Sequence, residues 1–131
     1  MPPRKSRPQL PAISDAEWIV MREFWSRGEG TAADIVAALA GRMHWKPRTV
    51  QSLNNRLVQK GALEFEKLSR EHLYRPAVAE SDCVMEVSQT FVDRIFGGKL
   101  APLLACFVER GAVSETEMAQ LRRILSASPV C

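Results

Sequence analysis

At 131 residues, of which 46% are hydrophobic, the chain is long enough for one folded domain, or for a small domain with an oligomerisation segment. Its three cysteines, Cys83, Cys106 and Cys131, follow neither a disulfide framework nor the CxxC spacing of a metal site, so we expect a reducing compartment and no metal. No cofactor is expected either. The absence of a signal peptide and of a membrane-length apolar run predicts a cytoplasmic protein without membrane insertion.

The net charge of +3 is unevenly spread along the chain. Residues 1–76 carry 13 Lys and Arg against 8 Asp and Glu, whereas residues 77–131 carry 5 against 7. Such an imbalance indicates a basic binding half, followed by a half with another task.

Two capping boxes predict the first two helices. Ser14-Asp-Ala-Glu17 starts a helix that runs to about residue 26, and Thr31-Ala-Ala-Asp34 starts a second helix that Gly41 closes. A third helix is bounded by Pro47, which suits a first helical position, and by Gly61, which suits the left-handed residue just past a helix end. The second and third helices, joined by a short link, predict a helix-turn-helix.

The third helix has one apolar and one polar face. Val50, Leu53 and Leu57 form its apolar stripe, and Asn54 lies near that stripe, where it needs an internal hydrogen-bond partner. The segment contains no carboxylate and is rich in Arg, Gln, Asn, Ser and Thr, which hydrogen-bond base edges and phosphate oxygens in a major groove. A solvated surface helix that lacks acids by chance is the alternative.

After the third helix, the sequence pattern changes to that of a β-hairpin. Residues 62–68 and 72–76 alternate apolar and polar side chains around a turn at residues 69–71. A helix-turn-helix followed by a hairpin is a winged helix. The predicted wing carries Lys67, Arg70 and His72 near its tip, where phosphates can be met; alternatively, Arg70 is an exposed turn residue with no partner.

Residues 81–131 predict three short helices, at about 81–96, at 101–110 and from the capping box Ser114-Glu-Thr-Glu117 onward. Their apolar faces exceed what one small lobe can cover, so we expect a second copy to cover them in a two-fold dimer; folding back onto the N-terminal domain is the alternative. The expected interface residues are Val84, Val87, Phe91, Ile95, Leu103, Leu104, Phe107, Met118, Leu121 and Leu125.

The predicted fold is therefore mainly α with a small β-hairpin. A basic arm at residues 1–12 precedes a winged helix-turn-helix domain at 13–78, and a three-helix dimerisation domain follows at 79–131. A winged helix of this kind, paired by a dimerisation region, reads an inverted repeat in double-stranded DNA.

The chain resembles the penicillinase-repressor family of bacterial transcription factors, the BlaI/MecI/CopY group. The resemblance lies in Ile13-Ser-Asp-Ala-Glu-Trp, Trp45-Lys-Pro-Arg-Thr-Val-Gln-Ser, Arg56-Leu-Val-Gln-Lys-Gly-Ala-Leu and Tyr74-Arg-Pro followed by Glu80-Ser-Asp. It implies a homodimeric repressor that binds an inverted-repeat operator with the start of the third helix in the major groove. Together with the basic tip of the predicted wing, the candidate DNA contacts are Lys46, Arg48, Thr49, Gln51, Ser52, Asn55, Arg56, Lys67 and Arg70.

The resemblance also implies how such a repressor is released. In the β-lactam-responsive members, a membrane-bound metalloprotease sensor leads to cleavage between an Asn and a Phe of the dimerisation region. The matching pair here is Cys106-Phe107, which departs from that pattern. The copper-responsive members carry a C-terminal cysteine cluster, of which this chain has only Cys131.

Other functions were weighed from the same residues. One alternative is a redox- or ligand-responsive regulator acting through Cys83 or Cys106, and another is a winged-helix module that binds only protein. An enzyme is not predicted, because His44 and His72 are isolated and no catalytic constellation or phosphate-binding loop is present in the sequence.

Overall fold

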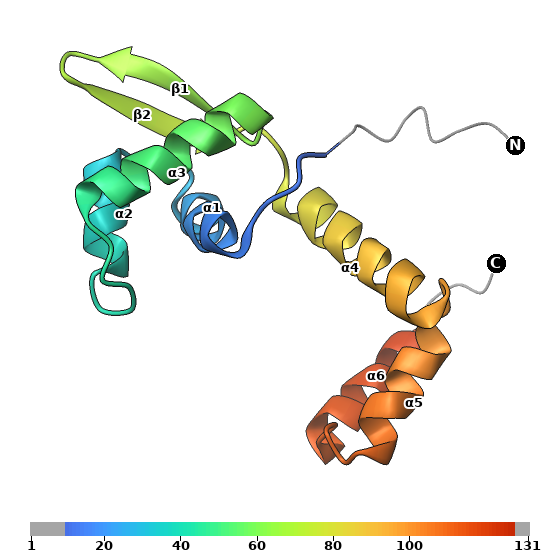
Figure 1. The fold of residues 1–131 in the computed structure, drawn as a ribbon. Coiled ribbons are helices and arrows are strands. Elements are labelled where there is room, and N and C mark those ends of the chain that lie inside the picture. Colours follow the sequence, from blue (N-terminus) through green and yellow to red (C-terminus); the bar gives the residue numbers. More distant parts are fainter. Residues whose placement is uncertain (1–9, 128–131) are drawn as a thin grey trace, which may run out of the picture. The chain divides into compact units, whose positions relative to one another are not determined.

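The structure, a computed structural model, describes residues 10–127, so most of the predicted arm lies outside the described residues (Figure 1). The described part is mainly α, with six helices and one two-stranded sheet, as predicted. The chain divides into two compact units, residues 1–86 and 87–131, and the division falls within a helix. The predicted domain boundary after residue 78 stays a prediction.

Both capping boxes of the first unit form as predicted. At the start of α1 (Asp15–Arg27), the Ser14 hydroxyl accepts from the Glu17 N–H, and the Glu17 carboxylate accepts from the Ser14 N–H. The same reciprocal pair joins Thr31 and Asp34 at the start of α2 (Ala32–Leu39). The prediction that Gly41 caps α2 is wrong, because α2 ends earlier and residue 40 caps it in the right-handed helical region.

Helix α3 (Pro47–Lys60) has the predicted ends. Pro47 occupies its first turn, and Gly61 adopts a φ of 85°, the left-handed conformation in which its N–H reaches the carbonyls of Leu57 and Val58. Strands β1 (Leu63–Leu68) and β2 (Glu71–Pro76) follow and pair antiparallel as the predicted hairpin. The chain therefore carries a winged helix.

The hairpin is fastened to the helices through its second strand. Gly30, in the loop after α1, exchanges two backbone hydrogen bonds with Tyr74, at 2.9 and 2.8 Å. Further along, the Trp25 indole N–H donates to the Val78 carbonyl at 2.9 Å, which ties the segment after the hairpin back to α1. These bonds join residues distant in sequence and fix the base of the wing.

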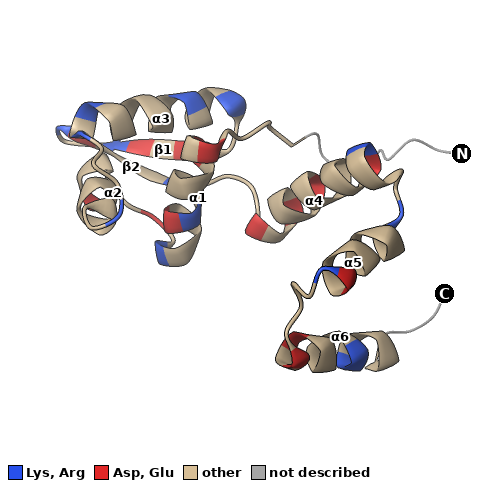
Figure 2. Cartoon of the chain, turned by 60° about the horizontal axis from the view of Figure 1, so that its bottom comes forward, with Lys and Arg blue, Asp and Glu red and all other residues tan. Residues whose placement is uncertain are grey.

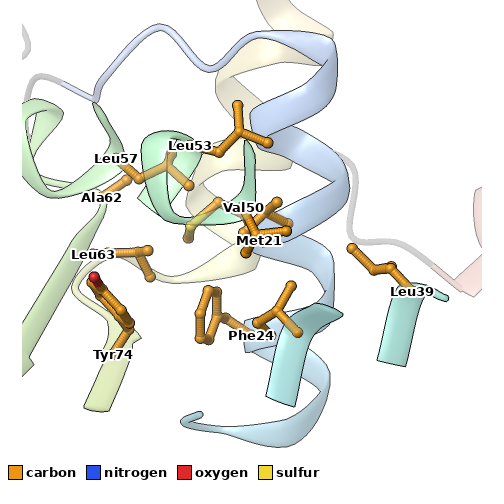
Figure 3. Close-up of a cluster of buried hydrophobic side chains, with 11 residues drawn as sticks. Met21, Phe24, Leu39, Val50, Leu53, Leu57, Ala62, Leu63 and Tyr74 are labelled. Carbon is orange, nitrogen blue, oxygen red and sulfur yellow. The ribbon is translucent and has the colours of Figure 1, made fainter. Parts of the chain in front are cut away.

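The core of the first unit lies among α1, α2, α3 and the base of the hairpin (Figure 3). In the close-up, Val50, Leu53 and Leu57 of α3 face the helix that carries Met21 and Phe24. This is the predicted apolar stripe, and it leaves the opposite side of α3 uncovered by these contacts. The buried core residues are Val20, Met21, Phe24, Ile35, Leu39, Val50, Leu53, Leu57, Ala62, Leu63 and Tyr74.

The remaining helices are α4 (Glu80–Phe96), α5 (Leu100–Glu109) and α6 (Glu115–Ala127), in the predicted order. The Ser114 hydroxyl accepts from the Glu117 N–H at 3.1 Å, which starts α6 as expected. Neither α5 nor α6 contains a buried residue. Among residues 10–127, no helix is long and apolar enough to cross a membrane, and no cluster of three or more His, Cys, Asp or Glu is placed to hold a metal ion.

Candidate nucleic-acid interface

The exposed side of α3 carries the predicted DNA contacts. Lys and Arg residues are distributed along α3, and the helix has no acidic residue (Figure 2). Within residues 10–127, none of its predicted contact side chains forms a hydrogen bond or an ion pair with another residue. The exposed predicted contacts at and on this helix are Lys46, Arg48, Thr49, Gln51, Ser52, Asn55 and Arg56.

Helical spacing sorts these residues into two adjacent rows. One row borders an open hollow of about 630 Å³ and consists of Lys46, Thr49, Ser52, Leu53 and Arg56. Arg48 also lines this hollow. Gln51 and Asn55 continue the row that begins at Arg48, at the i+3 and i+7 positions. Adjacent rows of amide, hydroxyl and guanidinium groups on one helix can hydrogen-bond both base edges and phosphate oxygens.

A partly buried ion pair holds the far end of α3. Lys60, the last residue of the helix, donates to the Glu17 carboxylate and, at 2.8 Å, to the Ala12 carbonyl. Glu17 is only 1% exposed. Burial by itself raises the pKa of the Glu17 carboxyl, but the hydrogen bonds from Lys60 and from the Ser14 backbone outweigh it and bring the pKa below its ordinary value. The capping box of α1 therefore also anchors α3, a role that the local sequence pattern did not reveal.

The wing places its two predicted contacts at the tip. Lys67 lies near the end of β1, and Arg70 lies in the tight turn, where Ser69 adopts a positive φ of 29°. Both side chains are exposed. Figures 1 and 2 show the tip of the hairpin at the same end of the unit as the start of α3. Basic groups of the wing and of the recognition helix are therefore presented at one end.

The helices of the second unit expose apolar side chains. Of the predicted interface residues, Leu103, Leu104, Met118 and Leu121 are half-buried and the others are exposed. A groove of about 360 Å³ runs between α5 and α6 and is bordered by Leu103, Leu104, Phe107 and Leu121. Two further exposed apolar residues of α4 and α5, Met85 and Leu100, were not part of the predicted stripes.

Comparison with known proteins places the chain in a family. The family model described as "Penicillinase repressor" matches residues 13–127. The chain belongs to the penicillinase repressor family. Relatives are the penicillinase repressor of Bacillus licheniformis, 33% identical over 117 residues that cover 89% of this chain and 91% of the relative, and the methicillin resistance regulatory protein MecI of Staphylococcus aureus, 32% identical over 114 residues that cover 87% and 93%.

A solved structure gives the same result for the first unit. The solution structure of the DNA binding domain of the repressor BlaI is 36% identical to this penicillinase repressor family member, with a TM-score of 0.51. The likeness covers 56% of this chain and 90% of that domain. Family membership confirms the resemblance read from the quoted motifs.

In this family member, the recognition helix also contains an unpaired buried amide. Asn54 is fully buried, and neither its Oδ1 nor its Nδ2 has a hydrogen-bond partner within the described residues. The prediction that Asn54 lies at the buried side of α3 is confirmed, but the partner that it was expected to need is not there. An unpaired buried amide costs about 1–3 kcal/mol of stability.

The two described cysteines have different environments. Cys83, on α4, is buried, and burial together with the charge of Asp82 raises the pKa of its thiol, which leaves less of the reactive thiolate at neutral pH. Cys106, on α5, is exposed. The Cys106–Phe107 bond, the predicted cleavage site, lies inside α5. Cys131 lies outside the described residues.

Proposed function

We propose that this family member binds an inverted-repeat operator as a homodimer and represses the promoter that contains it. Membership of the penicillinase repressor family makes it a DNA-binding transcriptional repressor, not an enzyme. The observation that carries the proposal further is the exposed side of α3, which has no acid and whose polar groups have no partner among the described residues. A repressor of this kind works in the cytoplasm, where the DNA is.

Base reading is assigned to the row that begins at Arg48. An Arg guanidinium donates two hydrogen bonds to guanine, and Gln or Asn side chains pair in the same way with adenine, which suits Arg48, Gln51 and Asn55. Binding of phosphates at the edges of the groove is assigned to Lys46, Thr49, Ser52 and Arg56. The DNA backbone beside the groove is bound by Lys67 and Arg70 of the wing.

Dimerisation is assigned to α4, α5 and α6. A three-helix segment in which neither α5 nor α6 has a buried residue, and whose interhelix groove is apolar, lacks a core of its own within the described residues. A second copy of the same surface supplies complementary apolar groups, as two-fold dimers do. Two winged helices related by a two-fold axis then read the two halves of an inverted repeat.

The cleavage site that the family resemblance implies, Cys106–Phe107, lies in α5. We propose that cleavage, if a membrane-bound metalloprotease sensor system acts here, occurs at the Cys106–Phe107 bond. The carbonyls of these residues accept hydrogen bonds from the Arg110 N–H at 3.3 Å and from the Ala112 N–H at 2.9 Å, so the end of α5 must unwind first. Fragment masses from cells exposed to a β-lactam would reveal the cut, and an intact chain during derepression would exclude it.

Selection from random duplexes tests the operator. The purified chain should enrich an inverted repeat with fixed half-site spacing, and enrichment of no sequence would remove specific repression. Binding should also weaken steeply as salt rises, because Lys and Arg release counterions from the phosphates that they neutralise. A module that binds only protein would show neither property.

Arg48→Ala tests the assignment of base reading. The substitution should cost about 1–3 kcal/mol in binding to the selected operator and relax specificity at one position of each half-site. Arg22→Ala is the matched control, because Arg22 is also an exposed helical arginine but lies on α1, outside the proposed interface. An equal loss on every duplex would assign Arg48 to a phosphate instead.

The redox alternative has a test of its own. If either thiol controls binding, the natural chain should lose operator affinity when it is oxidised. The variant with serine in place of Cys83 and Cys106 should then keep its operator affinity in the presence of oxidant. Equal affinity of both proteins with and without oxidant would exclude this alternative.

A further inference from the structure

The two faces of the wing differ in charge. Side chains of residues paired directly across an antiparallel hairpin lie on the same face, and side chains alternate along each strand. One face therefore holds Phe65 opposite Tyr74 and Lys67 opposite His72, and we call it the aromatic face. The other face holds Glu64, Glu66 and Glu71, which are all the carboxylates of the two strands.

The aromatic face holds the imidazole of His72 in a fixed position. The His72 and Phe65 rings are stacked, with centroids 4.4 Å apart and 21° between their planes. His72 also meets the edge of Tyr74 at 6.0 Å, and Tyr74 is buried and packs against Phe24 of the core. Phe65 is 44% exposed and His72 is half-buried, so the stack is anchored on the side of Tyr74 and open to a ligand on the side of Phe65.

The acidic face is unsuited to a polyanion. Its one cation, Arg75, is bound to Glu66 at 2.7 Å and to Glu29 at 3.4 Å. Glu64 and Glu71 are exposed and have no partner among the described residues. A duplex that approached this face would meet uncompensated carboxylates, so the aromatic face is the one that DNA can approach.

Lys67 is the charged neighbour of His72 on the aromatic face. Helices α1 and α2 pack against β2. Three of their four acids are engaged elsewhere: Glu23 with Arg27 and Arg42, Glu17 with Lys60, and Asp34 with Thr31. The fourth, Asp15, is exposed in the first turn of α1. No carboxylate is paired with His72 within the described residues. The complete set of charged groups on those two helices is Asp15, Glu17, Arg22, Glu23, Arg27 and Asp34.

We propose that the wing binds DNA phosphates through the aromatic face, and that His72 takes up a proton as it does so. The proposal rests on the DNA binding of the proposed function and adds its regulation by pH. Lys67 and His72 are directly paired across the hairpin, so a phosphate bound between the two side chains would stabilise a positive charge on the ring. Histidine is the side chain whose charge most often changes in the physiological pH range.

The direction of the effect follows from linkage. Because the bound form holds more protons than the free form, affinity is highest at low pH and falls as pH rises through the value at which the bound ring loses its proton. We expect the affinity for DNA to fall about threefold to tenfold between pH 6 and pH 8 at constant salt.

Calorimetry measures the proton directly. The full chain is titrated with a short generic duplex at low salt near pH 7, in buffers with different heats of ionisation. The slope of the observed enthalpy against buffer ionisation heat gives the protons taken up per chain. A generic duplex is sufficient because phosphate contacts do not depend on sequence, so the test is independent of whether a specific operator exists.

Two variants assign the proton. His72→Phe keeps a ring stacked on Phe65 but cannot titrate, and it should abolish both the proton uptake and the fall in affinity. His44→Phe is the matched control, since His44 is the only other histidine of the chain and should not contribute. His72→Gln, whose folding is checked by circular dichroism, tests whether the result depends on the phenyl ring that His72→Phe introduces.

The outcomes separate this proposal from the proposed function. Uptake that His72→Phe removes and His44→Phe preserves supports the aromatic face as the DNA contact. Duplex binding without proton uptake, or uptake that survives His72→Phe, overturns the proposal and leaves repression intact. Failure to bind any duplex overturns both, whereas proton-linked binding without sequence selection overturns only the specific operator.

Discussion

The two units of the chain differ in what covers their apolar side chains. In the first unit, residues from α1, α2, α3 and the hairpin bury one another in a continuous core. In α5 and α6 of the second unit no residue is buried, and large side chains such as Ile124 and Leu125 are more than half exposed. The apolar face of α3 is thus covered within its own unit, whereas α5 and α6 present apolar side chains that no other described residue buries.

This difference has a thermodynamic consequence. A unit whose core is complete gains its stability within the chain, because apolar burial is the main favourable contribution to folding. A unit whose apolar faces are covered by a second copy is stable only in the assembly, so its stability depends on protein concentration. We therefore expect the unfolding of the first unit to be independent of protein concentration, and the unfolding of the second unit to depend on it.

The largest effect is expected from Phe24→Ala in the first unit. Phe24 is fully buried and touches Tyr74 at the base of the wing, with ring centroids 6.1 Å apart. Removal of a buried Phe side chain should lower the free energy of unfolding of this unit by about 3–5 kcal/mol. Urea denaturation followed by tryptophan fluorescence measures the change, and a loss below 1 kcal/mol would show that the core is less complete than the buried surface indicates.

Phe91→Ala makes the same change on α4 of the other unit. Phe91 is 43% exposed and touches only Phe96 among the described aromatic rings, at 6.0 Å. The stability of the first unit should not change, but the dimer should weaken by about 3 kcal/mol if the partner buries the ring completely. Sedimentation equilibrium gives the dimer constant. A constant equal to that of the natural chain would move the interface away from this stripe.

Most elements could be predicted because their signals are local. Capping residues such as Ser14 and Thr31, and Pro47 and Gly61 at the ends of α3, act through groups within one helical turn. The alternation of apolar and polar residues along the sequence was sufficient to predict the hairpin. The prediction that Gly41 caps α2 was wrong because the last turn of α2 ends without a residue in the left-handed conformation.

The features that escaped prediction join distant parts of the chain. The bond between Lys60 and Glu17 spans 43 positions, and the bonds of Gly30 with Tyr74 attach a loop to a strand. The aromatic face depends on cross-strand register, which fixes which of Phe65, Lys67 and His72 lie together. Short-range periodicity does not determine such pairs. The predicted DNA contacts stay a prediction, and most of them could be grouped from the sequence because they share one face of a single helix.

Glu17→Gln should have a smaller effect than Phe24→Ala, because Lys60 remains about one-third exposed and water can solvate part of its charge. We expect a loss of about 1–2 kcal/mol from the first unit at neutral pH. The folded chain holds the pKa of Glu17 below its ordinary value, so its contribution is present above about pH 4.5 and disappears as pH falls through the folded value. The difference between the two proteins should therefore shrink in acid, and a constant difference from pH 7 to pH 3 would contradict the ion pair.

The smallest effect, and the only expected increase in stability, comes from substitution of Asn54, whose side chain is buried in the first unit. Its amide is fully buried and unpaired within the described residues, and Leu has a similar volume without polar atoms. Asn54→Leu should raise the free energy of unfolding by about 1 kcal/mol, because it removes the cost of desolvating an amide that gains no hydrogen bond in return.

Asn55→Leu is the matched control for Asn54, since the neighbouring amide is exposed on the proposed DNA face. It should change stability by no more than about 0.5 kcal/mol and weaken operator binding, whereas Asn54→Leu should stabilise the fold and leave operator binding unchanged. Urea denaturation and operator titration of both variants give the four values. Destabilisation by Asn54→Leu would mean that the buried amide has a hydrogen-bond partner in solution, and that the core holds α3 through a polar contact as well as through its apolar stripe.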